Sequence, residues 1–347
     1  MPIITTPLTL KELPPPPPEK TGWPWTEQSE PLPDRMPDGS EWPRISVVTP
    51  SYNQGEFIEE TIRSVLLQGY PNLEYIIIDG GSTDNSVEII KKYEQYLAYW
   101  VSERDRGQSH ALNKGFRRAT GQFIGWQNSD DYYHPEIFTH VAKISVLQPN
   151  IDVVYGKIYY ADDETKTISP YPVSEVTLES MIPYPSVCNQ SVFFRDRVFN
   201  ENNFIDESFQ HCMDQEFIIR LLIKGYKFQS EYKIVGYYRL HNNAKSSKQI
   251  NVWAEEAMKL YKSIYQNIDL SLDVRKKSKD CIYGLCLDNF GKLRLELFRK
   301  SVMELVATLG MKALTPELII KYLISFVELK NIVIMKKIKN KIFVSDR

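Results

Sequence analysis

Three polar loops carry the residues of this sequence that are best suited to chemistry. Each loop follows directly on a short apolar run. The loops span residues 49–55, 79–84 and 128–131. Carboxylates in such loops can accept hydrogen bonds from a ligand or bind a hard cation through oxygen. We therefore expect Asp79 to hydrogen-bond a ligand and Asp130 with Asp131 to hold a metal ion.

The apolar runs before these loops predict the strands of an open parallel sheet. Residues 45–49 and 73–78 are apolar enough for strands buried on both faces. An amphipathic helix pattern follows each of the first two loops, which gives the repeating order strand, loop, helix. Further strands are predicted at 99–101, 122–127, 152–160, 187–194 and 228–240, and further helices at 108–119 and 214–224. Ligands bind such sheets at the carboxyl ends of the strands, so the three loops should open on one edge.

The pair Asp130 and Asp131 suits a clamp that holds a metal ion and a diphosphate. A nucleotide diphosphate leaving group carries several negative charges, which a bound cation neutralises as the bond to the transferred group breaks. Mg²⁺ and Mn²⁺ prefer oxygen ligands and need few from the protein when phosphates supply others. The alternative interpretation is that the two aspartates cap a helix before Pro135. The pair taken alone does not decide between these interpretations.

The amino-terminal residues 1–43 form a segment of their own, because proline recurs throughout them, including the run Pro14 to Pro18. Such a segment cannot sustain a helix or a sheet, so we expect polyproline II and irregular structure. A partner-binding role is one interpretation. The other is that the segment lies along the domain surface, anchored by Trp23, Trp25 and Trp42.

The chain after this segment divides into an α/β domain at residues 44–248 and a helical region at residues 249–347. Apolar residues of the helical region recur at the spacing of an amphipathic helix, as in Ala257, Leu260 and Ile264. The final stretch, residues 318–343, mixes apolar residues with lysines. It fits either a helix packed on the domain or an amphipathic helix lying on an anionic membrane surface.

Composition narrows the class of protein. The chain has 347 residues, of which 42% are hydrophobic and 25% charged, as in ordinary soluble domains. A formal net charge of −2 argues against nucleic acid as a partner. The sequence shows neither a signal-peptide pattern nor an uncharged apolar run long enough to span a membrane, so we expect a cytoplasmic protein, at most peripheral at the inner membrane face. The four cysteines, which fit buried thiols rather than a zinc site or a disulfide framework, are Cys188, Cys212, Cys281 and Cys286.

Five ordered motifs resemble those of family 2 glycosyltransferases, across residues 45 to about 245. They are TPSYNQGEFIEETIRSVLLQ at 49–68, IDGGSTD at 78–84, SERDRGQS at 102–109, ALNKG at 111–115 and WQNSDD at 126–131. The resemblance implies the GT-A fold, an α/β Rossmann-like open mixed sheet flanked by helices, here with a helical carboxyl-terminal extension. It also implies a nucleotide-diphospho-sugar donor, Mn²⁺ or Mg²⁺ as cofactor and, as a rule, inversion at the anomeric carbon.

Carried over position by position, the resemblance places the donor in the first two loops. Pro50 and Tyr52 would flank the nucleobase, and Asp79 would hydrogen-bond it. Gly80 stands where relatives often have a second aspartate, which is a departure from the family pattern. Further polar positions that match donor-binding positions of the family are Gln108, Asn113 and Lys114.

The resemblance places the metal at the third loop. Asn128, Ser129 and Asp130 occupy the family's Asp-x-Asp position, so Asp130 would ligate the metal and Asp131 would lie close to the donor. Asparagine at the first position keeps an oxygen ligand but lacks the charge. His241 falls where many GT-A enzymes have a late histidine that contacts the metal or the diphosphate.

The attacking hydroxyl of an acceptor must lose its proton, which in an inverting enzyme requires a carboxylate base opposite the leaving group. The segment Met213 to Leu221 resembles the start of the base-bearing helix of the family, so Asp214 is the candidate base. Glu216 is the alternative, because residues two apart on a helix point in different directions. An acidic cluster at this place can also simply stabilise the helix dipole.

The sequence as a whole predicts an inverting glycosyltransferase of bacterial surface polysaccharide or glycolipid synthesis, acting on a saccharide or lipid-linked acceptor. Two alternatives are a binding module for nucleotide sugars without catalysis and a nucleotidyltransferase that makes sugar nucleotides. The second would carry a glycine-rich, basic phosphate loop after its first strand, and residues 50–55 are not such a loop.

Overall fold

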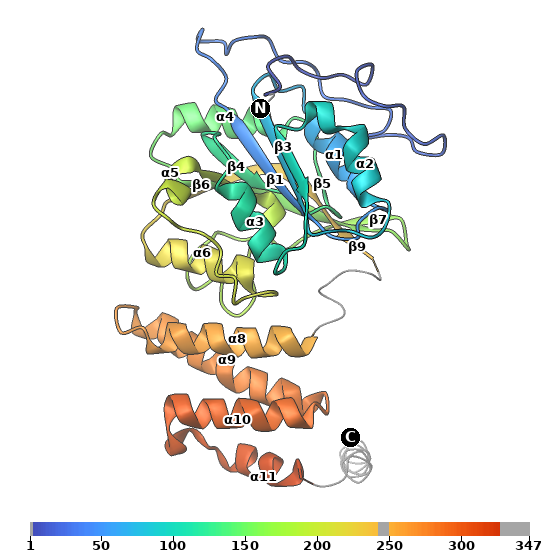
Figure 1. Cartoon of the computed structure of the whole chain (residues 1–347). Helices are drawn as coiled ribbons and strands as arrows, with labels where there is room; N and C mark the ends of the chain where they lie inside the picture. The colour runs from blue at the N-terminus through green and yellow to red at the C-terminus, as the bar shows by residue number, and fades with distance from the viewer. Residues whose placement is uncertain (1–2, 242–249, 327–347) are drawn as a thin grey trace, which may run out of the picture. The chain divides into compact units, whose positions relative to one another are not determined.

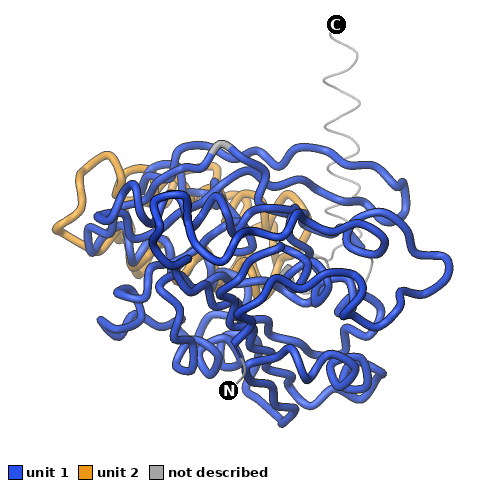
Figure 2. The backbone as a smooth tube through the Cα atoms, turned by 90° about the horizontal axis from the view of Figure 1, so that it is seen from above, with its two compact units in different colours: residues 1–248 blue, residues 249–347 orange. Residues whose placement is uncertain are grey.

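The structure, a computed structural model, describes residues 3–241 and 250–326. The chain divides into two compact units, Met1–Lys248 and Gln249–Arg347 (Figure 2). The first unit contains a β-sheet with its flanking helices, and the described part of the second is built from helices.

Nine strands of the first unit form one mixed sheet within the described residues. Their bounds are β1 Ile45–Ser51, β2 Leu73–Asp79, β3 Tyr99–Ser102, β4 Phe123–Trp126, β5 Tyr132–Tyr133, β6 Val153–Asp162, β7 Thr167–Pro170, β8 Val192–Arg195 and β9 Phe228–Leu240. The order across the sheet is β3-β2-β1-β4-β8-β6-β9-β5, with β7 paired to β6. The four strands from β3 to β4 are mutually parallel, whereas β8 is antiparallel to both β4 and β6. The loops after the four parallel strands therefore open on the same edge.

Helices cover both faces of this sheet (Figure 1). Their bounds are α1 Ile58–Leu66, α2 Ser86–Lys92, α3 Gln108–Phe116, α4 Ile137–Leu147, α5 Asp196–Asn200 and α6 Met213–Ile223. The buried stripe of α1 packs with alternate residues of the central strands, such as Val47 and Tyr75. On the opposite face α3 lies directly against β1, since a Cβ atom at Gly115 would come 2.3 Å from a methyl carbon of Val48. Residues 45–51 are all buried because helices cover both of their faces.

The sequence-based prediction of a Rossmann-like mixed sheet with flanking helices is confirmed. One difference concerns residues 187–194, which were expected to be extended throughout. The structure has a 3₁₀ turn at Asn189–Ser191 before β8 begins. Both the backbone N–H and the hydroxyl of Ser191 donate to the carbonyl of Cys188, at 3.0 and 2.7 Å, and these two bonds close the turn.

The proline-rich segment packs on the first unit, where it appears as the dark blue loops beside α1 and α2 (Figure 1). Trp25 and Trp42 are buried, and the Trp23 indole N–H donates to the backbone carbonyl of Tyr133 at 2.7 Å. The fully buried guanidinium of Arg63 on α1 is central to this packing. Its N–H groups donate to three backbone carbonyls of the segment, those of Pro14, Pro24 and Trp25, at 2.8, 3.1 and 3.0 Å.

The described part of the second unit is a stack of helices. Their bounds are α8 Ile250–Gln266, α9 Leu272–Gly291, α10 Leu295–Leu309 and α11 Pro316–Ile324. The predicted stripe on α8 is buried, including Ala257 and Tyr261. Leu293, whose φ of 58° lies in the left-handed region, separates α9 from α10.

None of the helices in the described parts of the chain combines the length and the apolar character that crossing a membrane requires. The basic stretch predicted at residues 318–343 is described only as far as residue 326, and its remainder lies outside the described residues. Contact of this stretch with a membrane surface therefore stays a prediction.

The packing of Arg63 makes a prediction about stability. We expect Arg63→Ala to lower the free energy of unfolding by about 3 kcal/mol, because it removes charge-assisted hydrogen bonds to buried carbonyls and leaves these unpaired. Urea unfolding followed by tryptophan fluorescence measures the change. The N-terminal segment of the variant should also be cleaved earlier than that of the wild type in limited proteolysis.

Arg35→Ala is the matched control, because Arg35 is an exposed arginine of the N-terminal segment whose side chain makes a 3.9 Å ion pair to exposed Glu41 and an exposed 3.0 Å hydrogen bond to the Gly39 carbonyl. Exposed pairs contribute little, so this variant should unfold within about 0.5 kcal/mol of the wild type. Equal stability of the two variants would show that Arg63 does not hold the segment.

Candidate active site

The ends of the four parallel strands are joined by backbone hydrogen bonds into one edge, which we call the carboxyl edge (residues 51–55, 79–84, 102–107 and 127–131). The N–H of Gly80 donates to the carbonyl of Ser51 at 2.8 Å, and the N–H of Glu103 donates to that of Asp79 at 3.0 Å. Gln127 is joined in the same way to β1, through the carbonyl of Val48 at 3.1 Å. The three loops singled out in the sequence therefore lie on this one edge.

Asp130 and His241 meet at the carboxyl edge, although 111 positions separate them in the chain. The Asp130 Oδ2 atom lies 3.2 Å from His241 Nε2. The side chain of Asp130 is 23% exposed and that of His241 only 6%, so a ligand can reach the carboxylate while the imidazole stays held. The ring of His241 packs against Phe57, with centroids 4.4 Å apart, and this contact fixes its orientation.

Arg239, which the sequence analysis did not single out, fastens the Asp130–Asp131 turn to β9. Its Nε atom donates to the Asp130 carbonyl at 2.8 Å, and its backbone N–H donates to Asp131 Oδ1 at 2.8 Å. The rest of the guanidinium pairs with Glu60 and Asp163, each at 2.9 Å. Burial lowers the pKa of Arg239, but these two carboxylates outweigh burial and the net pKa is raised. The only signal in the sequence was an arginine two positions before His241, at the end of a predicted strand.

Asp131 is almost fully buried, and both of its carboxylate oxygens have partners. Besides the bond from Arg239, Asp131 Oδ2 accepts from the side-chain amide of Asn128 at 3.1 Å. Burial, with the neighbouring charge of Asp130, raises the pKa of Asp131 well above its ordinary value, although the hydrogen bonds from Arg239 and Asn128 oppose the rise. Asn128 is held in turn, since its Oδ1 atom accepts from Gln108 and Trp126, each at 2.9 Å. In this geometry Asp131 stabilises the turn that presents Asp130.

The pair of Asp130 and His241 fits a hexacoordinate divalent cation. Two ligand atoms held at right angles, about 2.1 Å from such a cation, lie about 3 Å apart, close to the separation of Oδ2 and Nε2. No cluster of three or more His, Cys, Asp or Glu side chains that could hold a metal is found in the described parts of the chain. A cation at Asp130 and His241 would therefore need oxygen ligands from a substrate or from water, as Mg²⁺ and Mn²⁺ commonly do.

The residues expected to surround a nucleobase differ in their accessibility. Tyr52 is 60% exposed beside the end of β1, while Pro50 is buried within that strand. Asp79 is fully buried, and its carboxylate accepts hydrogen bonds from the N–H groups of Gly81 and Ser82 and from the hydroxyls of Ser82 and Ser102. Asp79 thus holds the loop after β2 in shape.

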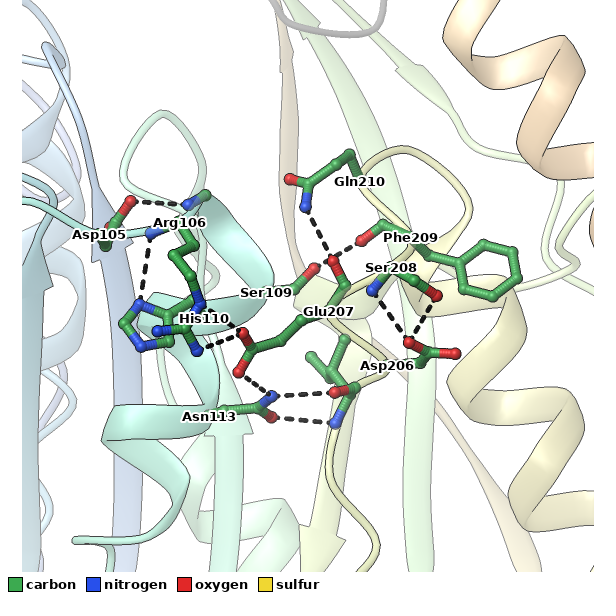
Figure 3. Close-up of polar contacts among 12 residues, drawn as sticks. Asp105, Arg106, Ser109, His110, Asn113, Asp206, Glu207, Ser208, Phe209 and Gln210 are labelled. Atoms are coloured by element: carbon green, nitrogen blue, oxygen red, sulfur yellow. Dashed lines mark hydrogen bonds and ion pairs between the residues drawn. The ribbon is translucent and has the colours of Figure 1, made fainter.

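The polar face of α3 binds the loop at residues 205–210, which leads into α6 (Figure 3). Asn113 is buried, and its amide exchanges hydrogen bonds of 2.9 Å with both backbone groups of Ile205. The hydroxyl of Ser109 donates to the Phe209 carbonyl at 2.8 Å. Lys114, by contrast, does not contact this loop in the same way. It pairs with Glu103, the first residue after β3. Asn113 in this geometry ties α3 to the loop.

The candidate base Asp214 lies in the first turn of α6. Its Oδ1 atom accepts from the Gln215 N–H at 2.8 Å. Burial raises the pKa of the Cys188 thiol well above its ordinary value; a hydrogen bond from Tyr171 opposes this rise, and the charges of Asp214 and Asp131 add to it. The charges of both carboxylates therefore act on the same thiol.

The alternative base, Glu216, is engaged elsewhere. Its two carboxylate oxygens accept from the guanidinium of Arg220, one turn further along α6, at 2.7 and 3.0 Å. Such a bidentate pair holds a carboxylate in one orientation. Glu216 is therefore engaged along the helix by Arg220.

Comparison with known proteins matches the part of the chain that carries these features. Residues 46–192 match the family model of glycosyl transferase family 2. YibD of Escherichia coli K12, named an uncharacterized glycosyltransferase, is 28% identical over 222 residues, covering 58% of this chain and 63% of that protein. An uncharacterized glycosyltransferase of Rickettsia bellii is 26% identical over 239 residues, covering 65% of this chain and 34% of that protein. The chain thus spans between a third and two thirds of the length of these curated relatives.

Solved structures share the fold. TarS of S. aureus, residues 1–349 in complex with UDP, superposes with a TM-score of 0.56 and 19% identity, covering 82% of this chain and 89% of that one. A mannosyltransferase of Pyrobaculum calidifontis in complex with GDP-Man and Mn²⁺ gives a TM-score of 0.53 and 16% identity, covering 82% and 84% of the two chains. At such low identity these likenesses concern the fold alone.

The family match covers four of the sheet's parallel strands and the loops that end them, including the turn that presents Asp130. The mixed sheet with its flanking helices is the one that the solved relatives share. Residues 46–192 are therefore similar to glycosyl transferase family 2, and the first unit has the GT-A fold.

Proposed function

We propose that this chain is an inverting glycosyltransferase that moves a sugar from a nucleotide-diphosphate donor to a hydroxyl of a saccharide or lipid-linked acceptor. The observation that carries the proposal is the pairing of Asp130 with His241, 3.2 Å apart at the carboxyl edge. The match of residues 46–192 to the family model supports glycosyl transfer, and the solved structures of similar fold that hold UDP, UDP-GlcNAc or GDP-Man support the class of donor. A role in bacterial surface polysaccharide or glycolipid synthesis is part of the proposal.

On this proposal the donor lies along the carboxyl edge. Tyr52 and Pro50 flank the nucleobase, and the diphosphate lies beside Asp130. Asp130 and His241 hold Mn²⁺ or Mg²⁺, which when bound neutralises the charge of the departing diphosphate. Asp131 and Asn113 are buried with their polar atoms in use, so direct contact with the donor would cost them existing hydrogen bonds. We assign both a supporting role behind the residues that contact the donor.

Three further residues complete the donor side of the proposal. Gln108 and Asn128, which are hydrogen-bonded to each other at 2.9 Å, would orient the donor next to Asp130. Lys114 lies within an ion pair with Glu103 and would reach a phosphate only by exchanging that partner. The exchange is feasible because the pair is partly exposed, and exposed pairs contribute little to stability.

The acceptor side is assigned to the start of α6. Asp214 would accept the proton of the attacking hydroxyl, because it lies in the first turn of the helix and its charge, like that of Asp131, acts on the thiol of Cys188. Glu216 is the weaker candidate, since taking up a proton would break its bidentate pair with Arg220. The polypeptide around α6 thus supplies the base, and the carboxyl edge supplies the leaving-group site.

The first test concerns Asp130. We expect Asp130→Asn to weaken the binding of a nucleoside diphosphate in the presence of Mn²⁺ by at least about ten-fold, because the variant loses the charged ligand of the cation. Donor hydrolysis should fall by about 100-fold or more. Isothermal titration calorimetry with UDP, GDP and dTDP measures binding, with and without Mn²⁺.

Asp38→Asn is the matched control for this test, because Asp38 is an exposed aspartate whose carboxylate only caps a turn at Ser40. It should bind nucleotides as the wild type does. If Asp130→Asn binds them equally well and shows the same response to Mn²⁺, the metal site proposed at Asp130 and His241 is wrong.

The second test concerns the base. Asp214→Asn should reduce kcat by about a thousand-fold, because the acceptor hydroxyl or water then has no carboxylate to take its proton. Nucleotide binding should stay within two-fold of the wild type, since Asp214 is not expected to contact the donor. Hydrolysis of a panel of UDP-, GDP- and dTDP-sugars gives kcat, and titration with the corresponding diphosphates gives binding.

Glu216→Gln serves as the comparison variant, because it removes a carboxylate from the same helical turn but one that is paired with Arg220. We expect its kcat to remain within a few-fold of the wild type. The opposite pattern, a collapse of kcat in Glu216→Gln with little change in Asp214→Asn, would move the catalytic role to Glu216.

A further inference from the structure

Gly80 and Asp105 compete for the same space at the carboxyl edge. A Cβ atom built at Gly80 would lie 2.7 Å from Asp105 Oδ2 and 3.1 Å from its carboxyl carbon. The backbone of Gly80 is not in the left-handed region, so a side chain here would meet no backbone strain but would require the Asp105 carboxylate to move. The carboxylate of Asp105 therefore occupies the place that a side chain at position 80 would take.

Asp105 is held in this place by a turn that requires glycine. Its Oδ1 atom accepts from the N–H of Gly107 at 2.8 Å, a contact drawn in Figure 3. Gly107 has a φ of 112°, a conformation that residues with a side chain rarely adopt. Among the described residues, no hydrogen bond to Oδ2 of Asp105 is found, and this is the oxygen that faces Gly80. One oxygen thus anchors the carboxylate and the other remains available.

Asp79 is more engaged than Asp105. It is fully buried, and its carboxylate accepts three hydrogen bonds from its own loop and one from Ser102 at the end of β3. Three of these bonds go to Oδ2, and a ligand that displaced them would free the loop. Asp105 is only partly buried and supplies a carboxylate at the same edge without that cost.

The neighbourhood of Asp105 suits a flat heterocycle. The N–H of Gly80 is bonded to the carbonyl of Ser51, directly before the exposed aromatic ring of Tyr52. The loop after β1 is joined to the loop after β2 a second time, because the N–H of Asn53 donates to the hydroxyl of Ser82 at 2.8 Å. An aromatic ring and an available carboxylate oxygen therefore belong to loops that are fastened together.

We propose that Asp105, in the space left by Gly80, accepts the hydrogen bond from the ring N–H of the donor nucleobase and so selects the base. This inference rests on the proposed function. A carboxylate accepts but cannot donate, so it pairs with the ring N–H of uracil, thymine or guanine. Cytosine and adenine present a ring acceptor at the equivalent position, and two acceptors facing each other repel. The site should therefore prefer UDP, dTDP or GDP to CDP and ADP.

The experiment measures dissociation constants of the five nucleoside diphosphates by calorimetry in the presence of Mn²⁺, together with kcat and KM for a hydrolysed donor. Asp105→Asn should weaken the binding of the preferred diphosphate by about ten-fold or more. It should also reduce the ratio of the affinity for that diphosphate to the affinity for CDP. KM should rise accordingly while kcat at saturating donor stays within a few-fold. Asp38→Asn is the control, because it removes an exposed carboxylate that only caps a turn at Ser40, outside the carboxyl edge.

A reciprocal exchange separates recognition from folding. Gly80→Asp alone should bind poorly, because the new side chain clashes with Asp105. Gly80→Asp combined with Asp105→Ala puts a carboxylate back into the same space from the other loop, and it should regain most of the affinity and the preference for the base. Asp105→Ser, whose hydroxyl can still accept from Gly107, checks that the turn is kept while the carboxylate is lost.

The outcomes distinguish this inference from the proposed function. Absence of binding of every diphosphate by the wild-type chain would overturn the proposed function. Normal binding by the wild type, with Asp105→Asn and Asp105→Ser indistinguishable from Asp38→Asn in affinity and preference, would overturn the inference alone. Loss of affinity that is equal for all five diphosphates, without rescue by the double variant, would also overturn it, because it would show a structural role.

Discussion

The burial of one positive charge, that of Arg239, is the constraint on which the arrangement of the site depends. A buried guanidinium must be paired and hydrogen-bonded, or the fold would be strongly destabilised. Arg239 meets this requirement with Glu60 from α1, Asp163 after β6 and the carbonyl of Asp130. Three parts of the chain that are distant in sequence are therefore fixed around one side chain.

This constraint explains why the Asp130–His241 pair is geometrically defined. Arg239 is the penultimate residue of β9, and His241 follows directly after the strand ends at Leu240. When Arg239 binds the Asp130 carbonyl, the imidazole of His241 is brought beside the Asp130 carboxylate. The buried charge of Asp131, which accepts the backbone N–H of Arg239, adds to the same attachment. A cation site made of only two protein groups can have a well-defined geometry when the residues that support it, here Arg239 and Asp131, are buried and hydrogen-bonded.

The sequence could predict the sheet because its information is local. Continuous apolar runs at residues 45–49 and 73–78 followed by polar loops have few interpretations other than buried parallel strands. The pairing of Asp130 with His241 could be predicted only from the resemblance of the motifs to a known family. No local pattern relates two residues that are 111 positions apart. Arg239 was missed because an arginine near a strand end resembles an exposed one until its partners are known. Asn113 shows the same limit, because the sequence cannot distinguish an amide that binds a ligand from one that binds the Ile205 backbone.

The contacts of α3 indicate how the proposed leaving-group site and the proposed base are held at a fixed distance from each other. Gln108 at the start of α3 bonds Asn128 on the carboxyl edge, while Ser109 and Asn113 bond the loop that leads to Asp214. One short helix therefore contacts the side proposed for the leaving group and the side proposed for the base. In-line displacement depends on the distance between these two sides, and a misplacement of about 1 Å can cost about 100-fold in rate. A rigid link through buried, fully paired polar groups is a physical means of holding that distance, and it requires no residue of the link to contact the substrate.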